Sequence, residues 1–238
     1  MTVFDGLYLY EIVLLFMGVI LFIAALIALF TKKSYAAVVP IFLISVVMVA
    51  YPSIQSVSYE NGKVTIQTKA RELLKDPTND ALRKSLQQDL AKVSARPTSD
   101  PKTAVTFAQA QLAVGQDELA RQNLNKALQA NPHLQEAQEL KHKFELSDNL
   151  EALTAKVAQT PSDAAAKTEL QNTTSELNKI GVANPKILTN MARAYGVLGN
   201  NEQAHATVDK AIKIDPNLSA AKEVKSRLVM VNPTINSR

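Results

Sequence analysis

The side chains best suited to binding a metal ion are histidines, and two of them follow a glutamate at a fixed spacing. The pairs are Glu139-x-x-His142 and Glu202-x-x-His205. Di-iron helical bundles use this spacing, but they need two such pairs in equivalent places and two further inward-facing glutamates. Here the pairs lie on polar segments that share no common register. The sequence therefore predicts no metal site.

Other catalytic chemistry lacks its usual residues. The chain has no cysteine, which excludes disulfides, cysteine-based zinc sites and a thiol nucleophile. Its seven glycines form neither a phosphate-binding loop nor a Gly-x-Ser-x-Gly elbow. Adjacent carboxylates such as Asp117 and Glu118 fall near expected helix starts, where they complement the helix dipole. We predict a protein that is not an enzyme, with no catalytic residue, no cofactor and no small-molecule ligand.

The charges of the chain argue against nucleic acid as a partner. The formal net charge is only +4, and lysines and arginines alternate with aspartates and glutamates throughout the hydrophilic part. Nucleic-acid binding requires a concentrated basic surface. We expect the partners to be other proteins, with membrane or envelope proteins as the favoured class, together with the lipid bilayer.

Two apolar stretches near the N-terminus, uncharged over residues 12–30 and 35–51, form the cores of two predicted membrane spans. The spans cover about residues 9–30 and 35–54, and a span of roughly 20 apolar residues matches a bilayer core about 30 Å thick. The first stretch lacks a preceding basic region, and it is too long for a cleaved signal peptide. Small residues at Gly18, Ala24, Ala25 and Ala28 permit close helix packing, either between the two spans or with another membrane protein.

The two spans are separated by a short loop that carries Lys32 and Lys33. By the positive-inside rule, this loop lies in the cytoplasm, and the N-terminus and everything beyond residue 54 lie on the opposite side. Asp5 and Glu11, which precede the uncharged run 12–30, agree with that direction, whereas basic residues after the second span weakly oppose it. For a bacterium, the predicted location is the inner membrane with the large domain in the periplasm.

A β-hairpin is predicted where the chain leaves the membrane, over residues 55–68. Asn61-Gly62 stands between alternating apolar and polar residues, which is the pattern of a type I′ turn. Closing this turn pairs Tyr59 with Val64 and Val57 with Ile66 on one face.

The remaining chain contains a tandem duplication of 84 residues. Equivalent positions without a gap include Pro101/Pro185, Gly115/Gly199, Ala120/Ala204, Ala127/Ala211 and Pro132/Pro216. The duplication places His142 opposite Ser226, so the two Glu-His pairs do not coincide. The predicted domains are a transmembrane hairpin (1–54), the β-hairpin (55–68) and two helical units (69–149 and 150–238).

One 34-residue window in each unit resembles the tetratricopeptide repeat. Residues 185–218 place Ala192, Tyr195, Gly199, Ala204, Ala211 and Pro216 at the signature positions, and residues 101–134 match less fully, with Gln111 in the tyrosine position. The resemblance implies an all-α domain of about ten helices in antiparallel pairs, as a short superhelix or two stacked lobes.

In that family the first helix of each pair lines a concave groove that binds peptides or partner helices. By motif position, the resemblance implies eight partner-binding residues, namely Lys102, Val105, Gln109, Leu112, Lys186, Thr189, Arg193 and Val197. Their basic members favour acidic segments or a C-terminal carboxylate.

Three functions fit these features. The first is a membrane-anchored scaffold for the assembly or function of a cell-envelope complex. The second is a periplasmic chaperone-like factor for translocated or apo-proteins; the overall plan resembles the cytochrome c maturation factor with two spans and a tetratricopeptide domain, although that family has a long cytoplasmic segment between its spans. The third is a structural subunit of a larger membrane machine that is bound through its transmembrane helices.

Overall fold

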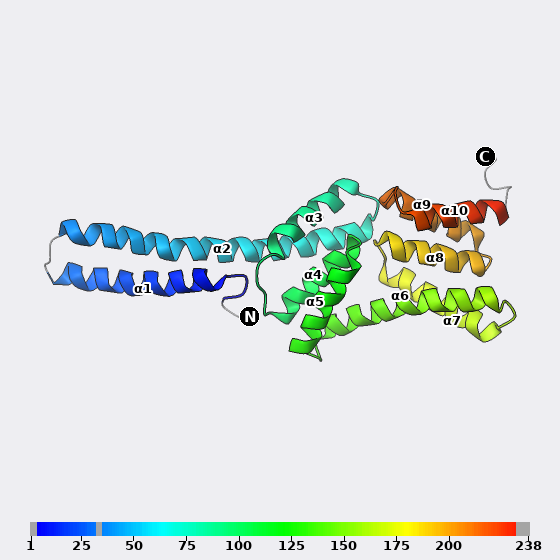
Figure 1. The fold of residues 1–238 in the computed structure, drawn as a ribbon, viewed down its shortest axis with the longest axis horizontal. Coiled ribbons are helices and arrows are strands. Elements are labelled where there is room, and N and C mark those ends of the chain that lie inside the picture. The colour runs from blue at the N-terminus through cyan, green and yellow to red at the C-terminus, as the bar shows by residue number, and fades with distance from the viewer. Residues whose placement is uncertain (1–3, 32–34, 232–238) are drawn as a thin grey trace.

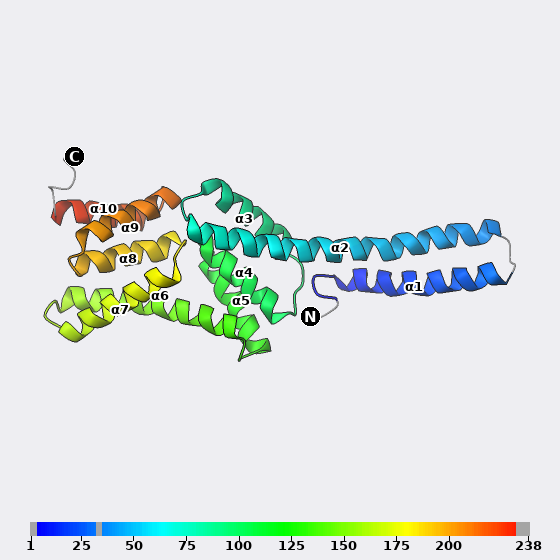
Figure 2. The same ribbon diagram turned by 180° about the vertical axis from the view of Figure 1, so that it is seen from behind.

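The protein is an elongated helical molecule in which a long two-helix hairpin projects from a helical domain (Figures 1 and 2). The structure is a computed structural model, and it describes residues 4–31 and 35–231. These residues form ten helices: α1 (Leu9–Phe30), α2 (Tyr35–Lys75), α3 (Asp80–Val93), α4 (Pro101–Ala113), α5 (Asp117–Ala130), α6 (Gln135–Gln159), α7 (Ala164–Ile180), α8 (Pro185–Val197), α9 (Asn201–Ile214) and α10 (Ser219–Val231). The prediction of an all-α repeat domain is confirmed.

The hairpin consists of α1 and the first half of α2, and α1 has the predicted bounds of the first span. Both helices are long and apolar enough to cross a membrane, and their large apolar side chains mostly face outward. Gly18 and Ala25 of α1 are buried against α2. A Cβ atom at Gly18 would lie 2.9 Å from the Met48 Cβ atom, so this glycine permits the close approach of the helices. The loop with Lys32 and Lys33 lies outside the described residues.

The predicted β-hairpin is wrong. Helix α2 continues without interruption through Asn61-Gly62 and ends at Lys75, and no strand occurs among the described residues. The predicted cross-strand partners therefore lie on one helix, where Tyr59 and Ile66 are buried while Val57 and Val64 are about 60 % exposed. An isolated hairpin is only marginally stable, whereas the helix adds a buried stripe to the domain core.

Packing explains why the helix continues through a turn-forming pair. Tyr59, Ile66, Ala70 and Leu73 recur at helical spacing and join α3 and α4 in one apolar core. Gly62 lies on the α3 side, where an added Cβ atom would come within 2.6 Å of the Val93 side chain. The glycine thus serves close helix packing rather than a turn with a positive φ angle.

The helix boundaries repeat at the interval of the duplication. Helices α4 and α5 occupy the same positions as α8 and α9 after a shift of 84 residues, and the starts of α3 and α6 match those of α7 and α10. The packing repeats as well. Within one series α2 contacts α3 and α4, and α6 contacts α4 and α5; within the next, α6 contacts α7 and α8, and α10 contacts α8 and α9. Helix α6 is therefore shared by both series.

Local capping supports this register. Asp100 and Asn184 stand before Pro101 and Pro185, and each side chain accepts a hydrogen bond from a backbone N–H of the helix that follows. Gly115 and Gly199 have φ angles of +88° and +79° at the ends of α4 and α8, so both turns require glycine.

Candidate protein-binding site

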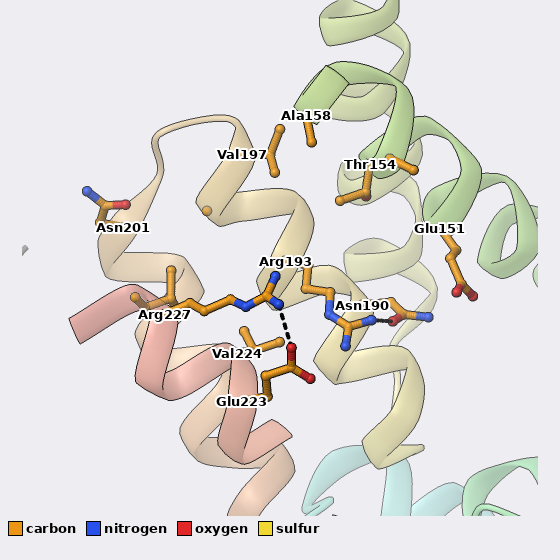
Figure 3. Close-up of a pocket in the computed structure, with 13 residues that line it drawn as sticks. Glu151, Thr154, Ala158, Asn190, Arg193, Val197, Asn201, Glu223, Val224 and Arg227 are labelled. Carbon is orange, nitrogen blue, oxygen red and sulfur yellow. Dashed lines mark hydrogen bonds and ion pairs between the residues drawn. The ribbon is translucent and has the colours of Figure 1, made fainter. Parts of the chain in front are cut away.

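The cavity at the end of the domain away from the hairpin has a volume of about 490 Å³. We call it the C-terminal cavity. Helices α6, α8 and α10 supply most of its walls, which include Thr154, Ala158, Val197, Val224 and Leu228. Figure 3 shows the labelled side chains of these helices surrounding the space. Such a mostly aliphatic surface with a few polar groups suits the burial of an apolar segment.

Charged side chains occur on the rim of the C-terminal cavity. Arg227 donates a hydrogen bond to Glu223 one turn earlier in α10, with Nη2 2.6 Å from Oε1. Arg193 donates to the Asn190 side chain of α8 at 3.3 Å (Figure 3). The Arg227 side chain is 77 % exposed, so its guanidinium remains accessible to another acceptor.

A cavity of about 400 Å³ lies between α2, α4 and α6. We call it the N-terminal cavity. Most of its lining positions from these helices become those of the C-terminal cavity after adding 84: Gln67/Glu151, Ala70/Thr154, Arg71/Ala155, Leu74/Ala158, Thr106/Asn190, Gln109/Arg193, Leu112/Gly196, Ala113/Val197, Glu139/Glu223, Leu140/Val224 and Lys143/Arg227. The duplication has therefore produced two equivalent cavities.

The two cavities differ in what lies against them. Residues 180–184 and the start of α8 line the N-terminal cavity, and Lys143 Nζ donates a hydrogen bond to the Gly181 carbonyl at 2.7 Å. Burial lowers the pKa of the Lys143 ammonium to about 8, because the charged form loses solvation. Among the described residues, no segment takes the corresponding place at the C-terminal cavity.

The eight predicted partner-binding residues do not form one groove. Gln109 and Leu112 line the N-terminal cavity, and Arg193 and Val197 line the C-terminal cavity. The others are divided between surface and core: Lys102 and Lys186 are exposed, with Lys186 Nζ 3.4 Å from Asp117, whereas Val105 and Thr189 are buried. Helix α6 packs against both α4 and α8 and lines both cavities. Their role in binding stays a prediction.

Motif-based reasoning omitted the residues that α6 and α10 contribute, among them Ala158, Glu223 and Arg227. The duplication relates each of them to a residue of the N-terminal cavity, so the 84-residue shift identifies these positions once one of the two cavities is known. The histidine pairs are also rearranged. His142 Nε2 lies 2.8 Å from the Glu176 carboxylate of α7, not from Glu139.

A second polar cluster joins the N-terminal segment and α2 to the connection between α3 and α4. We call it the junction cluster, and it consists of Asp5, Glu11, Gln55, Lys63 and Arg96. Arg96 donates hydrogen bonds to Glu11, Gln55 and the Gly6 carbonyl at 2.6–3.3 Å. Asp5 accepts hydrogen bonds from the backbone N–H of Ser99 and the Thr98 hydroxyl. The cluster fixes the hairpin to the domain.

The family comparison bears on α8 and α9, of which α8 lines the C-terminal cavity. Residues 185–218 match the family model of the tetratricopeptide repeat. The matched segment covers α8 and α9, so the resemblance derived from the signature positions is confirmed for this window. A tetratricopeptide repeat indicates a protein–protein interaction scaffold. No curated protein and no solved structure matches the chain.

Proposed function

We propose that this protein is a membrane-anchored scaffold whose repeat domain binds another protein of the cell envelope. Its two apolar helices serve as the anchor, and the C-terminal cavity between α6, the tetratricopeptide-like helix α8 and α10 presents the binding surface. The orientation follows the predicted cytoplasmic Lys32-Lys33 loop, which places the domain on the extracytoplasmic side.

The continuity of α2 is the observation that supports this proposal most. One helix of 41 residues runs from the apolar hairpin into the core of the domain. A flexible linker would let the domain sample many positions, whereas a continuous helix with buried contacts on α3 and α4 holds it at a fixed distance from the bilayer. Helices α8 and α10, which line the C-terminal cavity, then lie at the end of the domain away from the anchor (Figure 1).

The hairpin itself offers less for recognition. Gly18 and Ala25, which permit close packing, are already used between α1 and α2. The discrete C-terminal cavity also favours a defined binding segment over a broad set of unfolded clients. We therefore place the scaffold ahead of the chaperone-like factor and of the subunit bound through its spans.

The anchor is tested by carbonate extraction and by labelling. Because the chain lacks cysteine, single-cysteine variants carry no background. We expect the protein to resist extraction, and we expect His133→Cys, but not Ser34→Cys, to react with an impermeant maleimide in intact spheroplasts. Extraction into the soluble fraction would contradict the anchor, and the reverse labelling pattern would contradict the orientation.

The scaffold role is tested by purification from membranes in mild detergent. We expect a partner to co-purify in a fixed ratio, and we expect Ala158→Arg, which fills the C-terminal cavity, to remove it. Ala152→Arg is the matched control, because Ala152 is exposed on the same helix outside the cavity. A protein that is reproducibly monomeric and free of partners would contradict the proposal.

A further inference from the structure

The N-terminal cavity shows how this fold receives a polypeptide segment. Residues Gly181–Asn184 connect α7 to α8 in a non-helical conformation, and they lie against the first series of helices. Ala183 is 2 % exposed and belongs to the same apolar core as Tyr59 and Leu86. Val182 and Ile187 are also buried. The segment thus forms one wall of the N-terminal cavity and packs its apolar side chains against the first series of helices.

Three side-chain hydrogen bonds to the backbone hold this segment. Lys143 donates to the Gly181 carbonyl at 2.7 Å, and Arg83 donates to the Ala183 carbonyl at 2.9 Å. Asn184 caps α8 and donates from its side-chain amide to the Leu112 carbonyl at 3.1 Å. Two basic side chains therefore donate hydrogen bonds to backbone carbonyls of the segment, and the Asn184 side chain of the segment donates one to the backbone of α4.

The second series carries equivalent groups, of which Arg227 lines the C-terminal cavity, whereas Lys167 belongs to α7 and is not among the residues that line it. Adding 84 converts Lys143 to Arg227 and Arg83 to Lys167, so both cationic donors are retained. It converts the Leu112 carbonyl to that of Gly196. Arg227 bonds only to Glu223 of its own helix, and the Lys167 ammonium has no hydrogen bond or ion pair among the described residues.

The turns that follow α4 and α8 also differ in whether another segment lies against them. A Cβ atom at Gly115 would meet the Pro185 ring at 3.8 Å, because the start of α8 covers that turn. At the equivalent Gly199, no heavy atom of the residues that the structure describes lies within 4 Å of the same position, apart from the glycine itself and its chain neighbours. The C-terminal cavity thus has a cationic donor in Arg227, an acceptor in the Gly196 carbonyl and apolar walls, and no segment among the described residues covers it as Gly181–Ile187 covers the first series.

We propose, as a refinement of the scaffold function on which it rests, that the C-terminal cavity binds an extended, uncharged aliphatic segment of another protein that leads into the N-terminus of a helix. The segment lies as Gly181–Ile187 lies on the first series. Arg227 and Lys167 donate to two of its backbone carbonyls, and a capping asparagine or a similar donor bonds to the Gly196 carbonyl.

Side-chain differences between the cavities define the preferred segment. Leu74, Arg71 and Leu112 are replaced by Ala158, Ala155 and Gly196, which widens the space next to the segment, while Ala70 and Ala113 become Thr154 and Val197. The site accordingly takes a leucine or isoleucine where the first series takes Val182. A second copy of the chain is disfavoured as the donor, because its own segment is already buried.

The test uses a fluorescent peptide of this chain, residues 179–190, and the same peptide with Val182→Leu, titrated with the full chain in detergent micelles. We expect saturable binding, tighter for the leucine peptide. Arg227→Ala should weaken it about tenfold, the effect of one charge-assisted hydrogen bond, and Ala158→Arg should abolish it. Lys222→Ala and Ala152→Arg, exposed on the same helices outside the cavity, should leave it unchanged.

Several outcomes would overturn the inference. They are the absence of binding of both peptides up to about 1 mM, binding that Ala158→Arg does not affect, and self-association of the full chain that Ala158→Arg abolishes. The scaffold function fails separately. A partner that still co-purifies with the Ala158→Arg variant would leave the scaffold standing and place its binding surface elsewhere.

Discussion

Arg96 Nη1 lies 3.0 Å from the Glu11 carboxylate, although 85 positions separate the two residues in the chain. Glu11 belongs to the first turn of α1 and is fully buried, while Arg96 lies between α3 and α4. This ion pair, with Gln55 of α2, connects the start of the first apolar helix to the repeat domain.

Removal of the Arg96 side chain should destabilise the protein strongly, because it leaves the Glu11 carboxylate buried and unpaired. We expect Arg96→Ala to lower the free energy of unfolding by about 3–5 kcal/mol, measured by chemical denaturation in detergent. The control is Lys84→Ala, which breaks an exposed pair with Asp80 and should cost less than about 1 kcal/mol. Equal losses for the two variants would show that the junction pair is not buried in solution.

The lowered pKa of Lys143 predicts a pH dependence of stability. Its folded pKa of about 8 lies below the ordinary value of 10.5, so the unfolded chain binds more protons between these two pH values. Stability contributed by this residue should therefore rise as the pH increases from about 8 to 10.5.

Denaturation at a series of pH values from 7.5 to 10.5 (in steps of about half a unit) measures this rise. Lys143→Met should remove the part of this rise in stability that Lys143 contributes. Lys126→Met, which changes an exposed lysine, should leave the pH dependence of the wild-type protein unchanged. Identical pH profiles for all three proteins would contradict the burial of Lys143.

The continuous helix at Asn61-Gly62 makes a prediction opposite to that of the β-turn. Asn61 is exposed within α2, so Asn61→Ala should raise the free energy of unfolding by about 0.5 kcal/mol through helix propensity. In a type I′ turn the same change would be destabilising, because it requires a positive φ angle of alanine. Thermal unfolding with far-ultraviolet circular dichroism decides between them.

A side chain at Gly62 should lower the stability of the protein, since α3 approaches α2 there. We expect Gly62→Ala to cost about 1 kcal/mol, the clash with Val93 exceeding the gain in helix propensity. The double variant with Val93→Ala should lose less than the sum of the single losses, because the two positions are in contact. Strict additivity would contradict this contact.

Close packing of α1 on α2 predicts a large effect at Gly18. A Gly18→Leu side chain would meet Met48 and the backbone of Val49, so it should lower the thermal stability in detergent micelles. Ile20→Leu, on the outward face of α1, should have little effect. An unchanged melting temperature for Gly18→Leu would show that the two helices separate in the micelle.

The local sequence determined much of the secondary structure. The uncharged apolar run over residues 12–30 predicted α1, and the span drawn around it has the bounds of the helix, because a long apolar run leaves few alternatives. The repeated Pro and Gly positions of the duplication lie at the ends of α4, α5, α8 and α9, since helix capping and positive φ angles depend mainly on neighbouring residues. The 84-residue register placed equivalent helices at equivalent positions before any contact was known.

Tertiary structure decided the rest. The Asn61-Gly62 pattern is a strong local turn signal, yet burial of Tyr59 and Ile66 against α3 and α4 stabilises a helix there, and the sequence window does not contain those partners. The same holds for Arg96 and Glu11, whose pairing depends on how the hairpin meets the domain. Finally, two cavities of equivalent lining differ because the chain supplies Gly181–Ile187 to one and, among the described residues, nothing comparable to the other.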